Sequence, residues 1–358
     1  MRISIIPFLI IVCYQLFFVF EEPKAQTGDS CMTAKRFVIA GVGDIMPGTS
    51  YPSPKYLPPD NNPYPLIENV ADILREPDIT FGNLEGSFLN EGEPLKKCRD
   101  TTNCYIFRIP EKYAGILSYA GFDLISIANN HFMDFGSPAV IRTMQLLDSL
   151  GIKYAGTEEV PYAIITRDSI TVGFCAFSVN KGTLNLNDYD TAEKIVRKLD
   201  SECNIVIVSF HGGAEGAENQ RVTRSREYFH GEDRGNVYEF AHKMIDAGAD
   251  VVFGHGPHVT RAIELYKDRL ICYSLGNFCT YRRINVAGPN GIAPVVRVET
   301  DITGRFISGD IIPVYHDAER IVRYDPLKRA LFKIRELTLL DFPDTGIEIT
   351  DDGKIIKK

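Results

Sequence analysis

Short apolar runs alternate with segments of helical spacing along most of the chain. The runs that are almost continuously apolar, and so predict strands buried on both faces, are residues 37–42, 78–81, 122–128, 205–210 and 251–253. The segments whose apolar positions recur with helical spacing are residues 65–75, 111–119, 136–150, 190–199 and 237–247. Two further pairs of runs predict antiparallel strands, namely 163–167 with 170–177 and 293–300 with 306–314. This alternation predicts one α/β domain with antiparallel additions.

Two polar segments and the C-terminal region do not fit this alternation. Residues 46–65 contain seven prolines and no periodicity, so we expect a long loop that either walls a substrate groove or is a solvated excursion. Residues 212–236 predict a second long, charged loop. The chain becomes basic and helical from residue 318, and residues 316–358 are interpreted as a helical extension followed by a frayed strand or tail.

The amino terminus has the pattern of an export signal. A positive start, an apolar run over residues 3–20 and the small residue Ala25 predict a secretory signal at residues 1–25, cleaved after Ala25. The apolar run is also long enough for an uncleaved membrane anchor. Either alternative places the rest of the chain outside the cytoplasm, as a secreted, periplasmic or membrane-anchored protein.

The net charge limits the classes of partner that we expect, and the expected export determines how the cysteines are interpreted. The net charge of −8 gives no basic footprint for nucleic acid, so we expect no nucleic-acid partner. Export makes Cys98 and Cys104, which flank a polar loop, candidates for a small disulfide. The cysteines within apolar runs are expected to be buried free thiols, and they are Cys175, Cys203 and Cys272.

The predicted strands end in side chains that bind metal ions. The candidate ligands at these strand ends are Asp44, Glu85, Asn130, His211, His255 and His258. Open α/β sheets place their sites at the carboxyl ends of the strands, so we expect these groups to converge. Carboxylate, imidazole and amide ligands suit one or two divalent ions of Mn, Zn, Fe or Mg. His131 adjoins Asn130 and is a candidate proton donor to a leaving group.

Other polar residues near these positions have two interpretations each. Glu215 follows His211 closely and either supports the site or is unrelated to it. Asn277 is either a turn residue or a structural brace, and Arg282 with Arg283 either meets an anionic substrate or faces solvent. The histidines without a strand-end position are interpreted as surface or structural residues, and they are His230, His242 and His316.

Six short motifs occur in a fixed order, and together they carry a family resemblance. They are Gly43-Asp44-Ile45-Met46, Gly82-Asn83-Leu84-Glu85, Ala128-Asn129-Asn130-His131 with Asp134-Phe135-Gly136, His211-Gly212-Gly213-Ala214-Glu215, Gly254-His255-Gly256-Pro257-His258-Val259 and Tyr273-Ser274-Leu275-Gly276-Asn277-Phe278. The set resembles that of the CapA family of capsule and poly-γ-glutamate biosynthesis proteins, which are related to the calcineurin-like metallophosphoesterases. The chain departs from the wider pattern at Met46, where an Asp-x-His motif has its histidine, and at Gly212, where the family has an aromatic residue.

The resemblance implies a fold, a site and a role. The fold is a four-layer αββα metallophosphatase-like sandwich over residues 37–315. The site has metal ligands at Asp44, Glu85, Asn130, His211, His255 and His258, and an acid at His131. The role is that of an exported metal-dependent hydrolase or transferase acting on an anionic polymer or phosphoester, beside a membrane-associated polymer synthase. The alternatives are a general calcineurin-like phosphoesterase and a non-catalytic protein for polymer binding or assembly.

Overall fold

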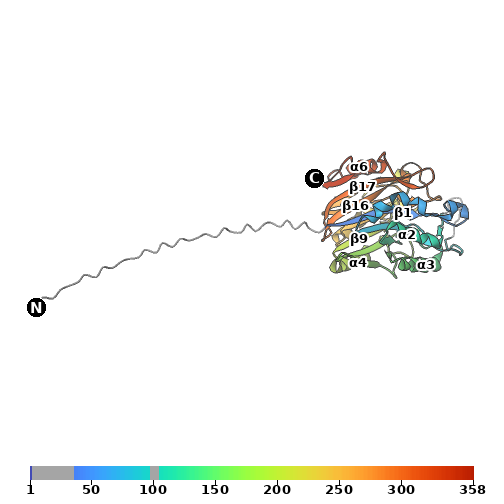
Figure 1. The fold of residues 1–358 in the computed structure, drawn as a ribbon, viewed down its shortest axis with the longest axis horizontal. Helices are drawn as coiled ribbons and strands as arrows, with labels where there is room; N and C mark the ends of the chain where they lie inside the picture. Colours follow the sequence, from blue (N-terminus) through green and yellow to red (C-terminus); the bar gives the residue numbers. More distant parts are fainter. Residues whose placement is uncertain (2–35, 97–104) are drawn as a thin grey trace. The chain divides into compact units, whose positions relative to one another are not determined.

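The computed structural model describes Met1 and residues 36–96 and 105–358, and residues 36–358 belong to one compact unit (Figure 1). The predicted signal at residues 1–25 and the candidate pair of Cys98 with Cys104 therefore fall almost wholly outside the described residues. Within the described ranges, no helix is both long and apolar enough to cross a membrane. Cys175 and Cys272 are buried free thiols, as expected, whereas Cys203 is a free thiol that is only partly buried.

The first sheet has ten strands in the order β19-β20-β17-β16-β1-β2-β5-β6, with β15 also paired to β1 and β18 to β17. Its parallel strands are β1 (Arg36–Met46), β2 (Ile79–Leu84), β5 (Leu124–Ser126), β6 (Lys153–Ala155) and β15 (Asn277–Thr280). The antiparallel additions are β16 (Ile292–Asp301), β17 (Phe306–His316), β18 (Val322–Tyr324), β19 (Ile347–Ile349) and β20 (Lys354–Lys357). The predicted pairing of 293–300 with 306–314 is confirmed by β16 and β17.

The second sheet has six strands in the order β13-β14-β12-β9-β8-β7. These strands are β7 (Tyr162–Arg167), β8 (Ile170–Ser178), β9 (Ile205–His211), β12 (Val251–His255), β13 (Ile263–Tyr266) and β14 (Arg269–Cys272). The predicted hairpin is confirmed by β7 and β8, which pair antiparallel around residues 168 and 169. Two short pairs lie apart from both sheets, namely β3 (Ser87–Phe88) with β4 (Arg108–Ile109) and β10 (Tyr228–Phe229) with β11 (Glu232–Asp233).

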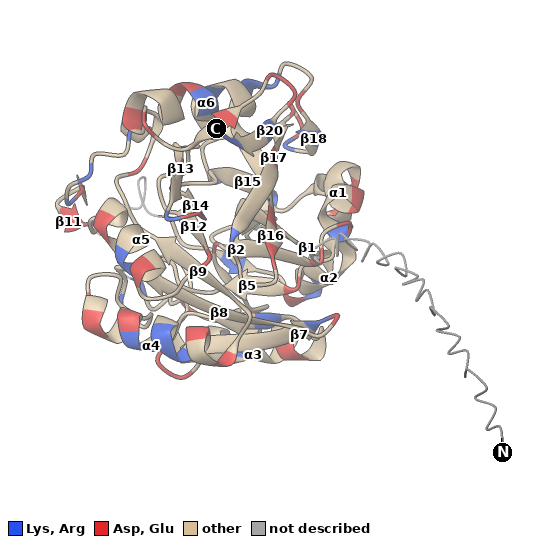
Figure 2. Ribbon diagram, turned by 90° about the vertical axis from the view of Figure 1, so that its left-hand side faces the viewer, with Lys and Arg blue, Asp and Glu red and all other residues tan. Residues whose placement is uncertain are grey.

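The two sheets pack face to face, and helices cover their outer faces (Figure 2). Phe81 of β2 lies between the sheets and stacks on Phe253 of β12, with ring centroids 5.3 Å apart. The first sheet is covered by α1 (Ala71–Arg75), α2 (Gly115–Ala120) and α3 (Gly136–Ser149). The second sheet is covered by α4 (Tyr189–Glu202) and α5 (Val237–Asp246). This arrangement confirms the four-layer αββα sandwich.

The segment after residue 316 joins the sandwich more closely than a helical extension with a tail implies. Its helix, α6 (Arg329–Asp341), begins only at Arg329, because Pro326 lies in a turn in which Asp325 accepts hydrogen bonds from the backbone of Leu327 and Arg329. α6 packs Leu331 into the core between the sheets. The last residues form β19 and β20, which extend the first sheet beyond β17.

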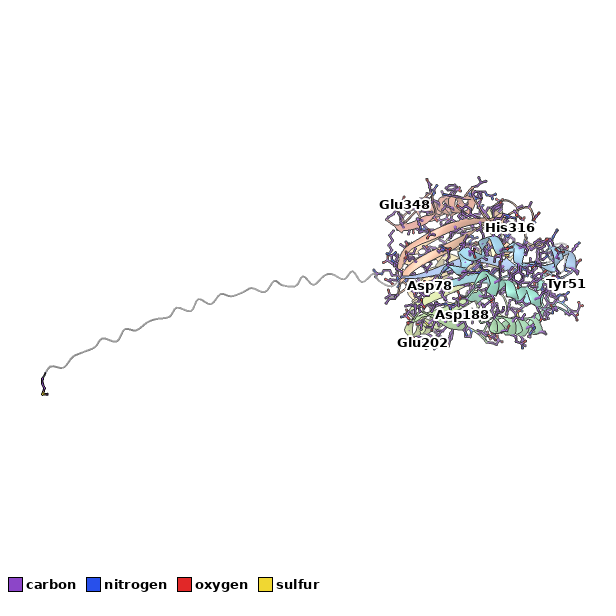
Figure 3. All side chains as sticks on the ribbon, in the orientation of Figure 1. Tyr51, Asp78, Asp188, Glu202, His316 and Glu348 are labelled. Carbon is purple, nitrogen blue, oxygen red and sulfur yellow. The ribbon has the colours of Figure 1, made fainter. Side chains whose placement is uncertain are left out.

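The helix expected over residues 65–75 is shorter than its apolar spacing indicates. Only α1 is α-helical, and it follows the 3-10 turns Tyr64–Leu66 and Glu68–Val70. Pro63 and Pro65 remove two backbone N–H donors and bias the residues before them away from the α region. The proline-rich loop that follows β1 contains Tyr51, which Figure 3 shows toward the opposite end of the molecule from Asp78, just before β2.

Candidate metal centre

Asp44 reaches the site because β1 can approach the segment before β15 very closely. The backbone N–H of Asp44 donates to the carbonyl of Gly276 (2.9 Å). A Cβ at Gly43 would lie 1.9 Å from the same carbonyl oxygen, so only glycine fits before Asp44. Glu85 follows β2, the parallel neighbour of β1. Both carboxylates are fully buried at the carboxyl ends of adjacent strands.

The imidazoles come from the second sheet. His211 ends β9 and His255 ends β12, and these two residues are paired in the parallel register of the strands. Neighbouring strands are about 4.8 Å apart, so the register sets the spacing of the two imidazoles. His258 lies in the turn beyond β12 with a φ of 57°, in the left-handed region. This turn passes against β9, because a Cβ at Gly256 would lie 2.7 Å from the carbonyl oxygen of Gly212.

Asp44 is the centre of the hydrogen-bond network. Its Oδ2 accepts from His258 Nδ1 (2.9 Å), and its Oδ1 lies 3.2 Å from His255 Nδ1. His258 Nδ1 also lies 3.0 Å from Asn277 Oδ1. Two oxygen acceptors face this nitrogen, so we infer that Nδ1 carries the proton and that Nε2 is left to bind a metal.

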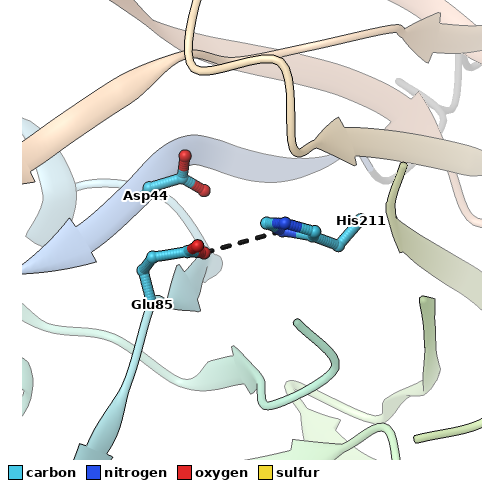
Figure 4. A group of neighbouring side chains, drawn as sticks. All are labelled: Asp44, Glu85 and His211. Atoms are coloured by element: carbon cyan, nitrogen blue, oxygen red, sulfur yellow. Dashed lines mark ion pairs between the residues drawn. The ribbon is translucent and has the colours of Figure 1, made fainter. Parts of the chain in front are cut away.

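Glu85 faces both Asp44 and His211, and the three side chains surround a common space (Figure 4). Its Oε2 accepts from Asn83 Nδ2 (2.7 Å) and lies 3.6 Å from His211 Nδ1. Asn83 Nδ2 also donates to Asp44 Oδ1 (2.8 Å), so one amide group holds the two carboxylates together. Ligand atoms of Asp44, Glu85 and His211 all lie within 4.8 Å of one another. Atoms that bind one ion at about 2 Å each lie at most about 4 Å apart, so small side-chain movements would let these groups share an ion.

Several buried polar atoms of the cluster have no hydrogen-bond partner among the described residues. They are Glu85 Oε1, Asn130 Oδ1, both ring nitrogens of His211, and His255 Nε2. A buried polar atom left without a partner costs about 1–3 kcal/mol, so an enclosed group of them is unfavourable unless a ligand binds there. All of these atoms are oxygen or imidazole nitrogen donors, which suit a divalent ion of the Mn, Zn, Fe or Mg type. The residues present therefore fit a metal.

The carboxylates and imidazoles shift one another's protonation. Burial opposes ionisation of Asp44, but hydrogen bonds from His255 and His258 outweigh it and hold the Asp44 pKa well below its usual range. Burial and the charge of Asp44 raise the pKa of Glu85 to about 8. Burial disfavours the charged form of His258, but its hydrogen bond to Asp44 raises its pKa to about 10. Burial and the charge of Arg234 hold the His211 pKa well below its usual value, which leaves a neutral imidazole suited to metal binding.

His131 is positioned beside the cluster by its own loop. Its Nδ1 lies 2.8 Å from Asp134 Oδ2, its backbone N–H donates to Asn129 Oδ1 (3.0 Å), and its Nε2 lies 4.0 Å from Glu85 Oε1. Phe107 packs against the imidazole, with ring centroids 4.1 Å apart. Burial lowers the His131 pKa and Asp134 opposes that shift. Asp134 therefore holds the ring through Nδ1, and Nε2 faces the candidate metal ligands.

The structure brings most of the candidate side chains into one cluster and places the remaining histidines elsewhere. Asp44, Glu85, His211, His255 and His258 are brought together, and Asn130 adds a buried oxygen without a partner among the described residues. Asn277 is the brace of His258, and Glu215 forms an ion pair with the buried Arg234 (3.0 Å). The remaining histidines lie elsewhere: His230 is exposed, His242 pairs with Glu264, and His316 accepts from the backbone of Thr280.

Two residues of the site were missed by sequence reasoning. Asn83 was counted only as a member of a strand-end motif, although its amide joins the two carboxylates. Asp134 was noted only as part of the motif after His131, and its position three residues beyond a histidine is the signal that indicates an orienting carboxylate. Asn83 lies two residues from Glu85 and Asp134 three residues from His131, so local spacing was the available clue.

Comparisons with known proteins identify the family of this chain. The model of the family "Bacterial capsule synthesis protein PGA_cap" matches residues 38–282, which is more than half of the chain. The "PGA biosynthesis protein CapA" of Bacillus subtilis (strain 168) is 27% identical over 89% of this chain and 81% of its own length. The "Capsule biosynthesis protein CapA" of Bacillus anthracis is 26% identical over 68% of this chain, and the match spans 60% of that relative.

A solved 5′-nucleotidase precursor from Thermus thermophilus aligns with 86% of this chain and 59% of its own length, at 12% identity and a TM-score of 0.45. The assignment itself rests on the family model and on the ordered motifs that build the buried cluster. The chain belongs to the PGA_cap family of bacterial capsule synthesis proteins.

Proposed function

We propose that this chain is an exported, metal-dependent hydrolase or transferase that acts on an anionic polymer during the synthesis of capsule or poly-γ-glutamate. The observation that carries the proposal is the set of buried oxygen and imidazole donors without partners, supplied by both sheets. A purely structural cluster would satisfy its polar atoms internally, because unsatisfied buried groups are costly. The proposed polymer substrate is inferred from the family, whose model is named for capsule synthesis, and from a similar protein that is named for PGA biosynthesis.

The residues have distinct roles in this proposal. Divalent ions held by Asp44, Glu85, Asn130, His211, His255 and His258 would supply Lewis-acid polarisation of the scissile group. Asn83 keeps the two carboxylates at a fixed spacing, and Asn277 fixes the ring of His258. His131 would give an Nε2 proton to the leaving group from its imidazolium form, which Asp134 at Nδ1 favours against the effect of burial.

A second candidate is a polymer-binding or assembly protein without catalysis, and one observation favours it. Met46 stands where the wider phosphoesterase pattern has a histidine, and its side chain is packed in the apolar core of the first sheet's outer face. That position therefore supplies no ligand. Loss of one ligand reduces the capacity for a second ion, on which two-metal displacement depends.

Metal analysis combined with two substrates separates the candidates. Purified protein is analysed for bound metal and then assayed on p-nitrophenyl phosphate and on poly-γ-glutamate, with metal-stripped protein as the control. We expect bound divalent metal and metal-dependent cleavage or transfer of the polymer. Turnover of the phosphoester alone would favour a general phosphoesterase. Bound polymer without turnover of either substrate would favour the assembly protein.

Export is a separate part of the proposal. The positive start, apolar run and Ala25 boundary predict a mature chain that begins at Gln26 or close to it. Mass spectrometry of the protein recovered from outside the cytoplasm measures this start directly. An intact Met1 on membrane-bound protein would show that the segment is retained as an anchor.

A further inference from the structure

The loop after β15 is tied directly to the candidate metal centre. Asn277 accepts from His258 Nδ1, and its Nδ2 donates to the carbonyls of Asn285 (3.1 Å) and Asn290 (3.1 Å). The same amide also donates to the carbonyl of His258 (3.2 Å). The side chain that orients a candidate metal ligand therefore also fixes the loop over residues 281–291 beside the site.

This loop carries two arginines in an unusual backbone conformation. Arg282 has a φ of 54° and Arg283 a φ of 57°, and Arg320, from the segment after β17, has a φ of 67°. Residues other than glycine avoid this left-handed region, and such conformations are concentrated at functional sites. Arg320 Nη1 donates to the carbonyl of Ile284 (3.2 Å), which places the third arginine against the same loop.

Arg282 and Arg320 are two like charges on neighbouring loops, and among the described residues neither is paired with a carboxylate. Arg320 Nη1 contacts the carbonyl of Ile284, two residues after Arg282, and burial and the positive charge of Arg282 both lower the pKa of Arg320. Neither arginine forms an ion pair with a described residue, and the hydrogen bond of Arg282 Nε is to the hydroxyl of Tyr281 (3.4 Å). By contrast, Arg323, close to Arg320 in sequence, pairs with Asp317. Two guanidinium groups held together in this way favour a bound anion.

Aromatic rings and a lysine continue this surface toward His131. The guanidinium of Arg283 lies 5.3 Å from the ring centroid of Tyr56 and 5.3 Å from that of Tyr105. Lys96 Nζ donates to the carbonyl of Tyr105 (3.1 Å) and lies 3.7 Å from Asp134 Oδ1. Asp134 is the carboxylate that orients His131. Basic and aromatic groups thus extend from the His258 side of the site to the His131 side, on a chain with a net charge of −8.

We propose that Arg282 and Arg320 form an oxyanion subsite that holds a charged group of an extended substrate beside the metal centre, with Tyr56 and Tyr105 flanking the substrate chain. This inference deepens the proposed function, since it makes these residues determinants of specificity for a polyanion. Guanidinium groups bind carboxylates and phosphates in similar geometry, so the shared chemistry is the oxyanion. The role of the subsite is binding, and it does not require that turnover occurs.

The test compares binding of two polyanions by matched variants. The probes are a short poly-γ-glutamate oligomer and a polyphosphate of similar length, titrated calorimetrically into the unaltered mature protein and into Arg282→Gln, Arg320→Gln and the double variant. The control is Arg305→Gln, which removes an exposed arginine next to β17, at the end of the sheet away from Asp44. Thermal unfolding and metal content establish that each variant is folded.

We expect each substitution in the subsite to weaken binding by about tenfold, and Arg305→Gln to leave it unchanged. A loss confined to poly-γ-glutamate assigns the subsite to carboxylates, and a loss confined to polyphosphate assigns it to phosphates. Equal binding by all variants, an equal loss in the control, or no binding of either probe by the unaltered protein would overturn the proposal. Binding without turnover would instead refute the proposed catalysis and leave the subsite standing.

Discussion

Replacing Glu85 with glutamine tests the electrostatics of the metal centre without adding or removing bulk. Burial, followed by the charge of Asp44, raises the Glu85 pKa from an ordinary value of 4.5 to about 8. Between these values the folded, metal-free protein holds a proton that the unfolded chain has released. The free energy of unfolding therefore falls as pH rises through this window, with a slope of up to about 1.4 kcal/mol per pH unit.

The cleanest interval lies between about pH 6.5 and 8, where this slope amounts to about 2 kcal/mol. His258 contributes with the same sign there, because its raised pKa of about 10 gives a stabilisation that is lost as pH rises. The buried His211, whose pKa is lowered, is neutral in both folded and unfolded chains in most of this interval. Glu85→Gln keeps an oxygen acceptor for Asn83 but carries no charge, so the variant should lose the part of the slope that Glu85 causes.

Denaturant unfolding of chelator-treated protein at several pH values measures this difference. Glu218→Gln is the control, because it makes the same chemical change at an exposed position. A divalent ion should flatten the slope of the unaltered protein, since the metal takes the place of the Glu85 proton. Parallel curves for Glu85→Gln and the unaltered protein without metal would refute this account of the cluster.

Three other substitutions separate binding, chemistry and packing. His131→Ala should keep its metal but lose turnover by about 10²–10⁴-fold, as expected for a general acid. Normal turnover in this variant would show that His131 is not the acid. His255→Ala should lose metal and turnover together in elemental analysis and activity assays, whereas full metal content would show that it is no ligand. Gly43→Ala should lower the free energy of unfolding by about 1–3 kcal/mol, because its Cβ meets the carbonyl of Gly276, and an unchanged value would show that the backbone can adapt.

The sandwich was predictable from the sequence because most of its strands have a clear local pattern of apolar residues. The runs within β1, β9 and β12 are almost continuously apolar, and the β7–β8 hairpin turns at Asp168 and Ser169, two polar residues with positive φ. The C-terminal strands were not predictable to the same degree. β20 is a strand because it pairs with Ser308–Asp310 of β17, and a partner so distant in sequence leaves no local pattern.

The site was partly predictable for a related reason. Strand-end polar residues indicated Asp44 and His255, since a glycine beside an apolar run marks a close backbone approach. The function of Asn83 depends on where Asp44 and Glu85 lie in three dimensions, and an asparagine within an apolar strand has no periodicity of its own. The link between Arg282 and Arg320 was likewise invisible, because the two residues come from different loops.

The division of the candidate ligands between the two sheets has a consequence for how the protein would acquire a metal. Asp44 and His255 are 211 positions apart in the chain, yet their side chains lie 3.2 Å from each other. No fragment that ends before β12 contains the complete donor set, and neither sheet alone supplies it. A metal held by the proposed ligands would be loaded after closure of the sandwich, because the donors converge only then. A metal-loaded molecule is therefore one whose chain has emerged and folded through residue 258, so metal content reports on completed folding as well as on the capacity for chemistry.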